Sequence, residues 1–160
     1  MIFVTIGSMM PFDRMIRAVD EIAARTPGQE FFSQIGEGAY EPRHMAFARM
    51  LSRRDFAAKM GEADLVIAHA GMGSVISAME LRKPIVILPR LAAAGEVNTD
   101  HQTATARWLA AKPGIHVALT EADLQAAIDQ ALAARGGAAL MSPVAPVDFL
   151  EKIRNCIAAA

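Results

Sequence analysis

The stretch between residues 64 and 89 constrains the fold more than any other part of the sequence. Its first part, 64–68, has four consecutive apolar residues after Asp64, and a strand without polar alternation is buried on both faces. A glycine-containing turn follows, then a segment of helical period with Val75, Ile76, Met79 and Leu81, and then the apolar run 85–89. Because parallel strands are joined by crossover helices in this order, we expect a β-turn-α-β unit.

The same alternation of strand-like and helical segments extends along most of the chain. Strands are expected at 2–6, 30–35, 115–118 and, with a weaker pattern, 45–51, and helices at 13–25, 55–61, 99–111 and after a Thr120 cap. We therefore predict an α/β fold, a Rossmann-like parallel sheet flanked by helices, for residues 1–135. The breakers Gly136, Gly137, Pro143 and Pro146 predict a linker within 136–160, which ends in a helix at 147–157 that packs on the domain or on a partner.

Composition and charge exclude several classes of protein. The 160 residues are 53% hydrophobic, enough for one packed core, and 16 Lys+Arg against 17 Asp+Glu leave a net charge of -1. Without a dense basic run, we expect no nucleic-acid partner. The single cysteine, Cys156, excludes a cysteine-based zinc site and favours a reducing compartment. The chain shows neither the ~20-residue apolar run of a membrane-spanning helix nor a signal-peptide pattern at its start, so we expect a cytoplasmic protein.

The turn after the central strand is the strongest candidate binding motif. Glycines let backbone amides approach a ligand, and the N-terminus of the following helix favours negative charge. The turn has neither the Gly-x-Gly-x-x-Gly spacing of dinucleotide sites nor the Gly-Lys-Ser/Thr of a P-loop, so neither NAD nor ATP is indicated. It predicts a diphosphate cradle, with a tight turn capped by Ser74 as the alternative. Its residues are His69, Ala70, Gly71, Met72, Gly73 and Ser74.

A second glycine turn follows the first expected strand. Gly7 and Ser8 come directly after the run 2–6, and the carboxyl ends of parallel strands meet at the edge of the sheet where open α/β proteins bind ligands. An ordinary β-α turn is an equally good interpretation of Gly7 and Ser8 alone. Together, the two turns indicate one phosphate-binding crevice.

Polar side chains beyond the turns supply further candidates. Glu80 lies in the helix after the first turn, where a carboxylate can accept both hydroxyls of a ribose; a solvated helix residue is the alternative. Four residues crowd the start of the helix expected at 99–111 and offer donors and acceptors to a sugar ring. Capping of that helix by Asn98 or Asp100 is the alternative. They are Asn98, Asp100, His101 and Gln102.

Two further side chains have competing interpretations. Arg90 follows a strand end at Pro89, where it can meet a phosphate or a donor carboxylate, although an exposed loop arginine is the favoured interpretation. His69 lies between a buried strand and the glycine turn. A structural histidine is the ordinary case beside such a strand, but this position suits a phosphate hydrogen bond comparably well.

The motifs above carry a resemblance to a known family. The run 63–74, together with Glu80, Pro84, Pro89 and 98–102, resembles the C-terminal domain of family-28 glycosyltransferases. In closer detail, the chain is similar to the small catalytic subunits of bipartite UDP-sugar transferases, in the dolichol pathway and in bacterial exopolysaccharide synthesis. The resemblance covers residues 1–135, and the alanine-rich loop 91–97 departs from the usual pattern.

The resemblance implies the donor half of a GT-B glycosyltransferase that binds a UDP-sugar. It implies Gly7 and Ser8 near the phosphates, the 69–74 turn around the diphosphate and Glu80 at the ribose. It also implies that Gln102, with its neighbours at 98–101, reads the donor sugar and that the uracil lies against the backbone of 54–57. Because no Asp-x-Asp motif is present, we expect no metal and no cofactor besides the donor substrate.

The resemblance places the rest of the enzyme on another chain. It implies that the acceptor site, the catalytic base and the membrane anchor belong to a partner subunit, which holds this chain at the cytoplasmic face of the membrane; the isolated chain can also form a homo-oligomer. The predicted function is the catalytic subunit that transfers a hexose-type sugar to a lipid-linked acceptor in polysaccharide or glycan synthesis, with His69 as its one catalytic candidate. A non-catalytic UDP-sugar-binding or regulatory subunit and a UDP-sugar epimerase are the alternatives.

Overall fold

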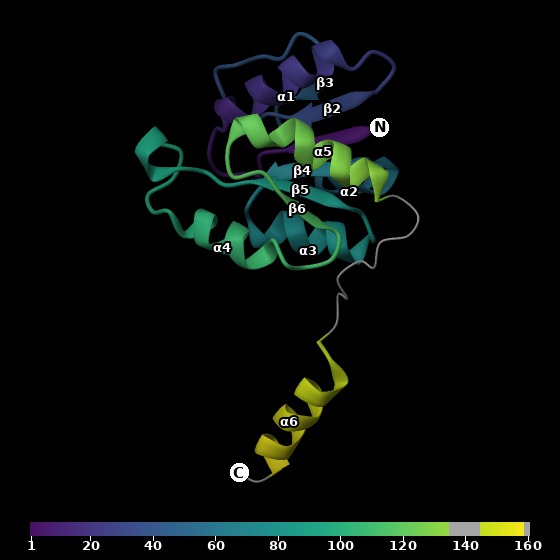
Figure 1. The fold of residues 1–160 in the computed structure, drawn as a ribbon, viewed down its shortest axis with the longest axis vertical. Helices are drawn as coiled ribbons and strands as arrows, with labels where there is room; N and C mark the ends of the chain where they lie inside the picture. The colour runs from purple at the N-terminus through teal and green to yellow at the C-terminus, as the bar shows by residue number, and fades with distance from the viewer. Residues whose placement is uncertain (135–144, 159–160) are drawn as a thin grey trace.

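A computed structural model describes residues 1–134 and 145–158, and its centre is one parallel sheet (Figure 1). Six strands lie in the order β3-β2-β1-β4-β5-β6, and every neighbouring pair is parallel. The strands are β1 (Ile2–Thr5), β2 (Phe31–Gln34), β3 (Ala46–Ala48), β4 (Leu65–His69), β5 (Ile85–Leu88) and β6 (Ile115–Val117). The predicted Rossmann-like α/β fold is therefore confirmed.

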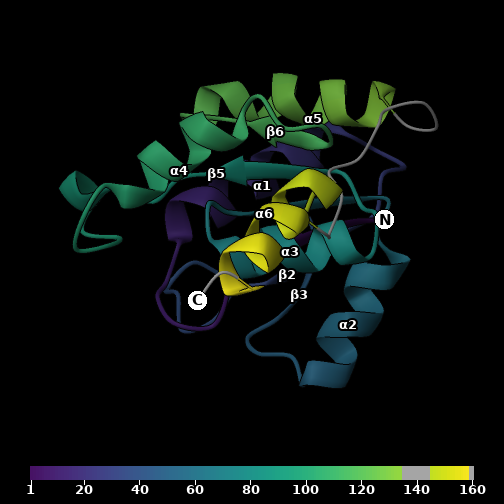
Figure 2. The same cartoon turned by 90° about the horizontal axis from the view of Figure 1, so that it is seen from below.

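Helices cover both faces of the sheet. On one face, α1 (Asp13–Arg25) and α5 (Leu124–Ala133) pack on the side chains of Ile2 and Val4. On the other face, α2 (Arg53–Glu62), α3 (Met72–Glu80) and α4 (His101–Leu109) pack around Phe3. Figure 2 shows α4, α3 and α2 in this order across the molecule. Because successive strand residues point to opposite faces, the uninterrupted apolar strands feed two hydrophobic cores.

The strand order reverses between β1 and β4. From β1 the chain moves outward to β2 and β3, and from β4 it moves in the opposite direction to β5 and β6. The loops after β1 and β4 therefore leave to opposite sides and open a crevice at the carboxyl edge of the sheet. In open α/β folds, this switch point is where ligands bind.

The predicted elements are present, with shifts at their ends. The weak third strand is reduced to the three residues of β3 at the sheet edge. Helix α2 begins before residue 55 because Ser52 caps it, accepting a hydrogen bond from Asp55 N at 3.1 Å. The predicted Thr120 cap forms a reciprocal capping box with Asp123, which encloses the 3-10 turn η2 (Glu121–Asp123) before α5. A second 3-10 turn, η1 (Ala92–Ala94), lies in the loop after β5.

The last helix, α6 (Val147–Ala158), makes no contribution to either core, and all its residues are exposed (Figure 1). Its exposed apolar side chains include Phe149, Leu150, Ile153 and Ile157. The predicted linker lies largely outside the described residues, and the domain boundary at 135 remains a prediction. Within the described ranges, no helix combines the length and the apolar character that crossing a membrane requires.

Candidate functional site

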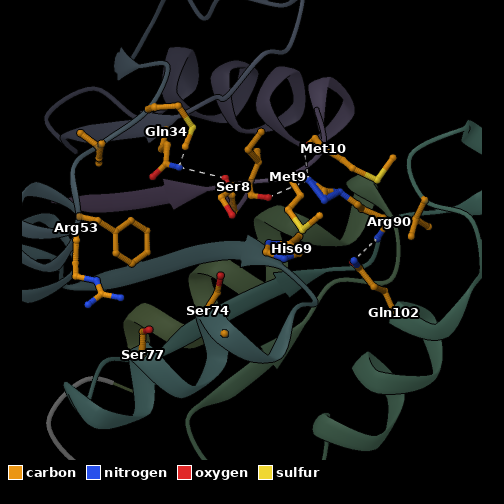
Figure 3. A pocket seen from close by; sticks show the side chains of 17 residues that line it. Ser8, Met9, Met10, Gln34, Arg53, His69, Ser74, Ser77, Arg90 and Gln102 are labelled. Atoms are coloured by element: carbon orange, nitrogen blue, oxygen red, sulfur yellow. Dashed lines mark hydrogen bonds between the residues drawn. The ribbon is translucent and has the colours of Figure 1, made fainter.

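A cavity of about 620 Å³ opens at the switch point (Figure 3). It is walled by the loop after β1, the ends of β2 and β4, the start of α2, one side of α3, and the loop after β5 with the start of α4. The two glycine turns therefore border one cavity, and phosphate binding there stays a prediction. Its lining residues are Ile6, Gly7, Ser8, Met9, Met10, Gln34, Met50, Leu51, Arg53, Phe56, His69, Gly73, Ser74, Ser77, Arg90, Val97 and Gln102.

The loop of residues 6–10 forms one wall, and side chains from β2 and from the end of β5 hold its carbonyl groups. Gln34 Nε2 donates to the carbonyl oxygen of Gly7 at 3.1 Å. Arg90 Nη2 donates to the carbonyls of Ile6 at 2.9 Å and Met10 at 2.6 Å. Gly7 has a φ of 79°, a conformation that glycine adopts without steric cost. The loop is thus fixed from both sides of β1.

The N-terminal turn of α3 forms the opposite wall. Gly71 occupies the N-cap position, and no side chain caps the helix. The capping role considered for Ser74 is therefore wrong: Ser74 lies inside the first turn and lines the cavity with Gly73 and Ser77. An uncapped N-terminus leaves backbone N–H groups free and carries a partial positive charge. This wall suits an anion.

The imidazole of His69 lies between the two glycine turns. A Cβ atom built on Gly71 would be 2.1 Å from His69 Nε2, and one on Gly7 would be 2.7 Å from Cε1. Both turns therefore need glycine, in part, because the ring occupies the space of a side chain. Burial, and secondarily the Arg90 guanidinium, lowers the pKa of His69 from 6.5 to about 4, so the ring is neutral near pH 7. Its Nδ1 is buried and has no hydrogen-bond partner among the described residues.

Arg90 is buried, with 4% of its surface exposed, so the favoured interpretation of an exposed loop arginine is wrong. Its guanidinium packs over the ring of Phe12 at 4.9 Å and lines the cavity. Burial lowers the pKa of Arg90, and Glu96 acts in the opposite direction. Arginine nonetheless keeps its charge in proteins, and no carboxylate in the described part of the chain forms an ion pair with it. The cavity therefore contains a cation without an anionic partner.

The loop after β5 is fastened to α1. Arg14 binds Glu96 through two hydrogen bonds of 2.7 and 2.8 Å and donates a third to Pro89 O at 2.8 Å. A bidentate pair of this kind fixes geometry as well as charge. The alanine-rich loop 91–97 is thereby held beside the cavity, where it contributes Val97.

The structure brings only one of the four predicted sugar-binding residues to the cavity. Gln102 is buried there, and its Oε1 accepts a hydrogen bond from Arg90 N at 3.1 Å. Asn98, Asp100 and His101 are exposed and do not line it. Asp100 occupies the N-cap position of α4, but its carboxylate accepts from Ala92 N at 2.9 Å, so neither it nor Asn98 caps the helix through its side chain.

Glu80 does not line the cavity either. It is the last residue of α3 and is exposed, and Ser77, one turn earlier, faces the cavity in its place (Figure 3). Of the residues predicted to bind the phosphates, only some line the cavity. Gly7, Ser8, His69, Gly73 and Ser74 line the cavity, whereas Ala70, Gly71 and Met72 do not.

Several lining residues were missed by sequence reasoning. Arg53 borders the cavity at the start of α2, just before the 54–57 segment expected at the uracil, and Phe56 within that segment contributes a side chain that was not predicted. Gln34 carried a detectable signal, because it is a polar residue at the carboxyl end of a strand, the edge where ligands bind. Ser77 carried none, because its role depends on how α3 is rotated about its axis.

The cavity lining contains no aspartate or glutamate. Within the described ranges, no three His, Cys, Asp or Glu residues lie together as metal ligands do. The absence of a metal requirement and of any further cofactor remains a prediction. Among the lining residues, His69 is the only one that can act as a base near neutral pH, and its low pKa makes it a weak one.

The fold and the crevice define the chain as a doubly wound, Rossmann-like α/β domain with its cavity at the switch point. It belongs to the glycosyltransferase family 28 C-terminal domain, which its sequence matches over residues 1–153. The recognition from sequence is therefore confirmed. A comparison with curated proteins gives no match.

Solved structures with a similar fold are glycosyltransferases or domains of similar size. The glycotransferase of kitacinnamycin has a TM-score of 0.60 at 18% identity, over 82% of this chain and 34% of that one. MurG of Acinetobacter baumannii has 0.58 at 21%, over 94% and 49%. The solution structure of ALG13 has 0.54 at 16%, over 95% and 93%. The chain thus spans half or less of the first two and nearly all of the third, and these likenesses show the GT-B C-terminal fold.

Proposed function

We propose that the chain is the catalytic, UDP-sugar-binding subunit of a two-component glycosyltransferase. Membership of a glycosyltransferase family gives the reaction class. The single observation that carries the donor assignment is the cavity itself: an uncapped helix N-terminus and a glycine loop face one another across it, with the unpaired cation of Arg90 beside them. Backbone donors and a buried cation are the groups that bind a diphosphate.

The shape of the cavity supports one orientation of the donor. The end beside Arg53 and Phe56 offers an aromatic side chain and a helix start for the uracil base. The diphosphate lies between Ser8 and the first turn of α3, with His69 able to donate a hydrogen bond in its neutral form. The sugar then lies at the end formed by Val97 and Gln102. In this arrangement Ser77 is nearer to the ribose than Glu80.

The second component supplies what the cavity lacks. Inverting transfer needs a base for the acceptor hydroxyl, and the lining offers no carboxylate and only the weakly basic His69. We therefore assign the acceptor site, the base and the membrane contact to a partner subunit, with a lipid-linked acceptor and a hexose-type donor in exopolysaccharide or glycan synthesis. The complex then operates at the cytoplasmic face of the membrane.

The same lack of a base favours one alternative, a UDP-sugar-binding subunit without turnover. Both functions need the same cavity, so binding alone does not separate them. The test measures transfer of radiolabelled sugar by the chain plus its partner. Loss of transfer when Gly73→Val is introduced here, with the partner left unchanged, shows that transfer needs this cavity and supports the catalytic function. Continued transfer by that variant complex assigns the chain a regulatory role.

Calorimetric titration of the purified chain tests the donor site. We expect UDP to bind and ADP to bind more weakly, with a panel of UDP-sugars ranking the donors. Unchanged UDP affinity in EDTA supports donor binding without a metal. If UDP does not bind either to the chain or to the chain co-purified with its partner, the proposed function is wrong.

A further inference from the structure

In the loop of residues 6–10, the backbone carbonyl groups and the backbone N–H groups differ in their hydrogen bonding. Three of its carbonyl groups, those of Ile6, Gly7 and Met10, accept hydrogen bonds from the side chains of Gln34 and Arg90. The N–H groups of Ser8, Met9 and Met10 have no hydrogen-bond partner within the described residues. The loop therefore has occupied acceptors, held by two side chains that line the cavity, and free donors.

The contact between Gln34 and Gly7 fixes the direction of one of these donors. The carbonyl of Gly7 and the N–H of Ser8 belong to the same peptide unit, and no peptide bond is cis in the described chain. In a trans peptide the C=O and N–H point in opposite directions. Since Gly7 O points to Gln34 Nε2, the N–H of Ser8 points away from Gln34. Figure 3 shows Ser8 between Gln34 and His69.

The opposite orientation of this peptide is sterically accessible because residue 7 is glycine. A glycine with positive φ allows the following peptide to rotate, because no Cβ opposes the change. With the peptide reversed, a carbonyl oxygen would face the cavity and repel an anion. Gln34 stabilises the first orientation by donating to the carbonyl.

The contacts of Gln34 are incomplete for a purely structural residue. It is 4% exposed, and its Oε1 is buried without a hydrogen-bond partner among the described residues. Its Nε2 contacts Met50 Sδ at 3.7 Å in addition to Gly7 O. A buried polar atom left unpaired costs stability, and this cost offsets part of what the bond to Gly7 O contributes to the fold. The amide is explained by what its nitrogen does to the loop.

We propose that Gln34 is a positioning residue for the diphosphate: it holds the Gly7–Ser8 peptide so that the Ser8 N–H faces the anion. The inference rests on the proposed function, since it assumes a nucleoside diphosphate in the cavity. Arg90 holds the same loop from the other side, but substituting Arg90 would also remove a positive charge from the cavity. Substituting Gln34 changes the support of the loop without changing the charge.

The experiment compares UDP with uridine on wild type and Gln34→Met, a variant of similar length that cannot donate. We expect UDP affinity to fall about tenfold, the scale of one lost hydrogen bond to a charged group. Uridine affinity, followed by NMR titration, stays unchanged because uridine has no phosphate. The Ser8 amide resonance shifts on UDP addition in wild type and much less in the variant. The midpoint of urea unfolding changes little, because loss of the hydrogen bond to Gly7 O is offset by removal of the unpaired oxygen.

The control is Gln130→Leu, which removes an exposed glutamine on α5 away from the cavity; UDP affinity should not change. Equal weakening of UDP and uridine, or unchanged UDP affinity in Gln34→Met, overturns the inference while the proposed function stands. Failure of wild type to bind UDP defeats the proposed function and the inference with it. Gln34→Leu serves as the second variant, and if neither variant folds, Gln34 is structural and the inference is wrong.

Discussion

His69 explains, at the scale of single residues, why both turns of the site contain glycine. A Cβ on Gly71 would lie 2.1 Å from Nε2 of the ring. The φ of Gly71, -100°, is one that any residue can adopt. The ring alone therefore excludes a side chain at Gly71. At Gly7 the positive φ adds a second reason, whereas at Gly73 nothing lies within 4 Å of the position that a Cβ would take.

We predict that Gly71→Ala lowers the free energy of unfolding by about 1–3 kcal/mol through overpacking. The same substitution in a His69→Ala background should cost less than about 0.5 kcal/mol, because the clash is removed. Urea unfolding of the four proteins measures this cycle. Gly73→Ala is the matched control and should leave stability unchanged or slightly raised, since alanine favours the helix. Equal cost of Gly71→Ala in both backgrounds would show that the ring is not the obstacle.

The depressed pKa of His69 predicts a pH effect on stability. Its pKa is about 4 in the folded protein against a usual 6.5, with burial as the main cause. The unfolded chain therefore binds a proton between these values while the folded chain does not, so stability falls as the pH drops from 6.5 toward 4. The loss attributable to this residue reaches up to about 3 kcal/mol. Above pH 7 the contribution is fully present.

Urea unfolding at pH 7.5 and pH 4.5 tests this effect in wild type and His69→Asn. We expect the variant to lose less stability than wild type over this range. Asp20 acts in a different window, because its lowered pKa affects stability only below its usual value of 3.8. An identical pH dependence in the two proteins contradicts a neutral, buried His69.

At the scale of elements, the strands and turns were predictable from the sequence, but the direction in which individual side chains point was not. Uninterrupted apolar runs identified β1, β4 and β5, and glycine marked the turns that follow two of them. The rotation of α3 about its axis determines whether Ser77 or Glu80 faces the cavity, and no local sequence pattern indicates this rotation. The burial of Arg90 depends on carbonyls of Ile6 and Met10, which are 84 and 80 residues away in sequence.

The rotation of α3 leads to a prediction about the ribose. Gly73, Ser74 and Ser77 face the cavity from one side of the helix, while Glu80 is exposed at its end. Ser77→Ala should therefore weaken UDP binding by about 0.5–1.5 kcal/mol through a lost hydrogen bond, and Glu80→Ala should leave it unchanged. Calorimetry with UDP measures both. The reverse result restores Glu80 to the ribose and requires α3 to turn or bend when the nucleotide binds.

At the scale of the whole molecule, the donor cavity and α6 are separable. The cavity is built from residues 6–102, and both cores, with their partly buried neighbours, lie within residues 1–132. Helix α6 contributes no residue to either, yet Phe149, Leu150, Ile153 and Ile157 recur at the spacing of one helix face. An apolar face that does not serve this domain's core is available to a partner.

We therefore predict that a chain ending at residue 134 keeps the UDP affinity of the full chain and a melting temperature within about 2 °C of it, because residues 145–158, the described part of the removed segment, are all exposed. Sugar transfer with the partner should fall sharply, as should co-purification. Leu150→Asp with Ile153→Asp in the full chain should reproduce that loss, while Glu151→Ala, an exposed control on the same helix, should not. A large drop in melting temperature on truncation would instead show that α6 packs on its own domain, and the partner would then have to recognise another surface.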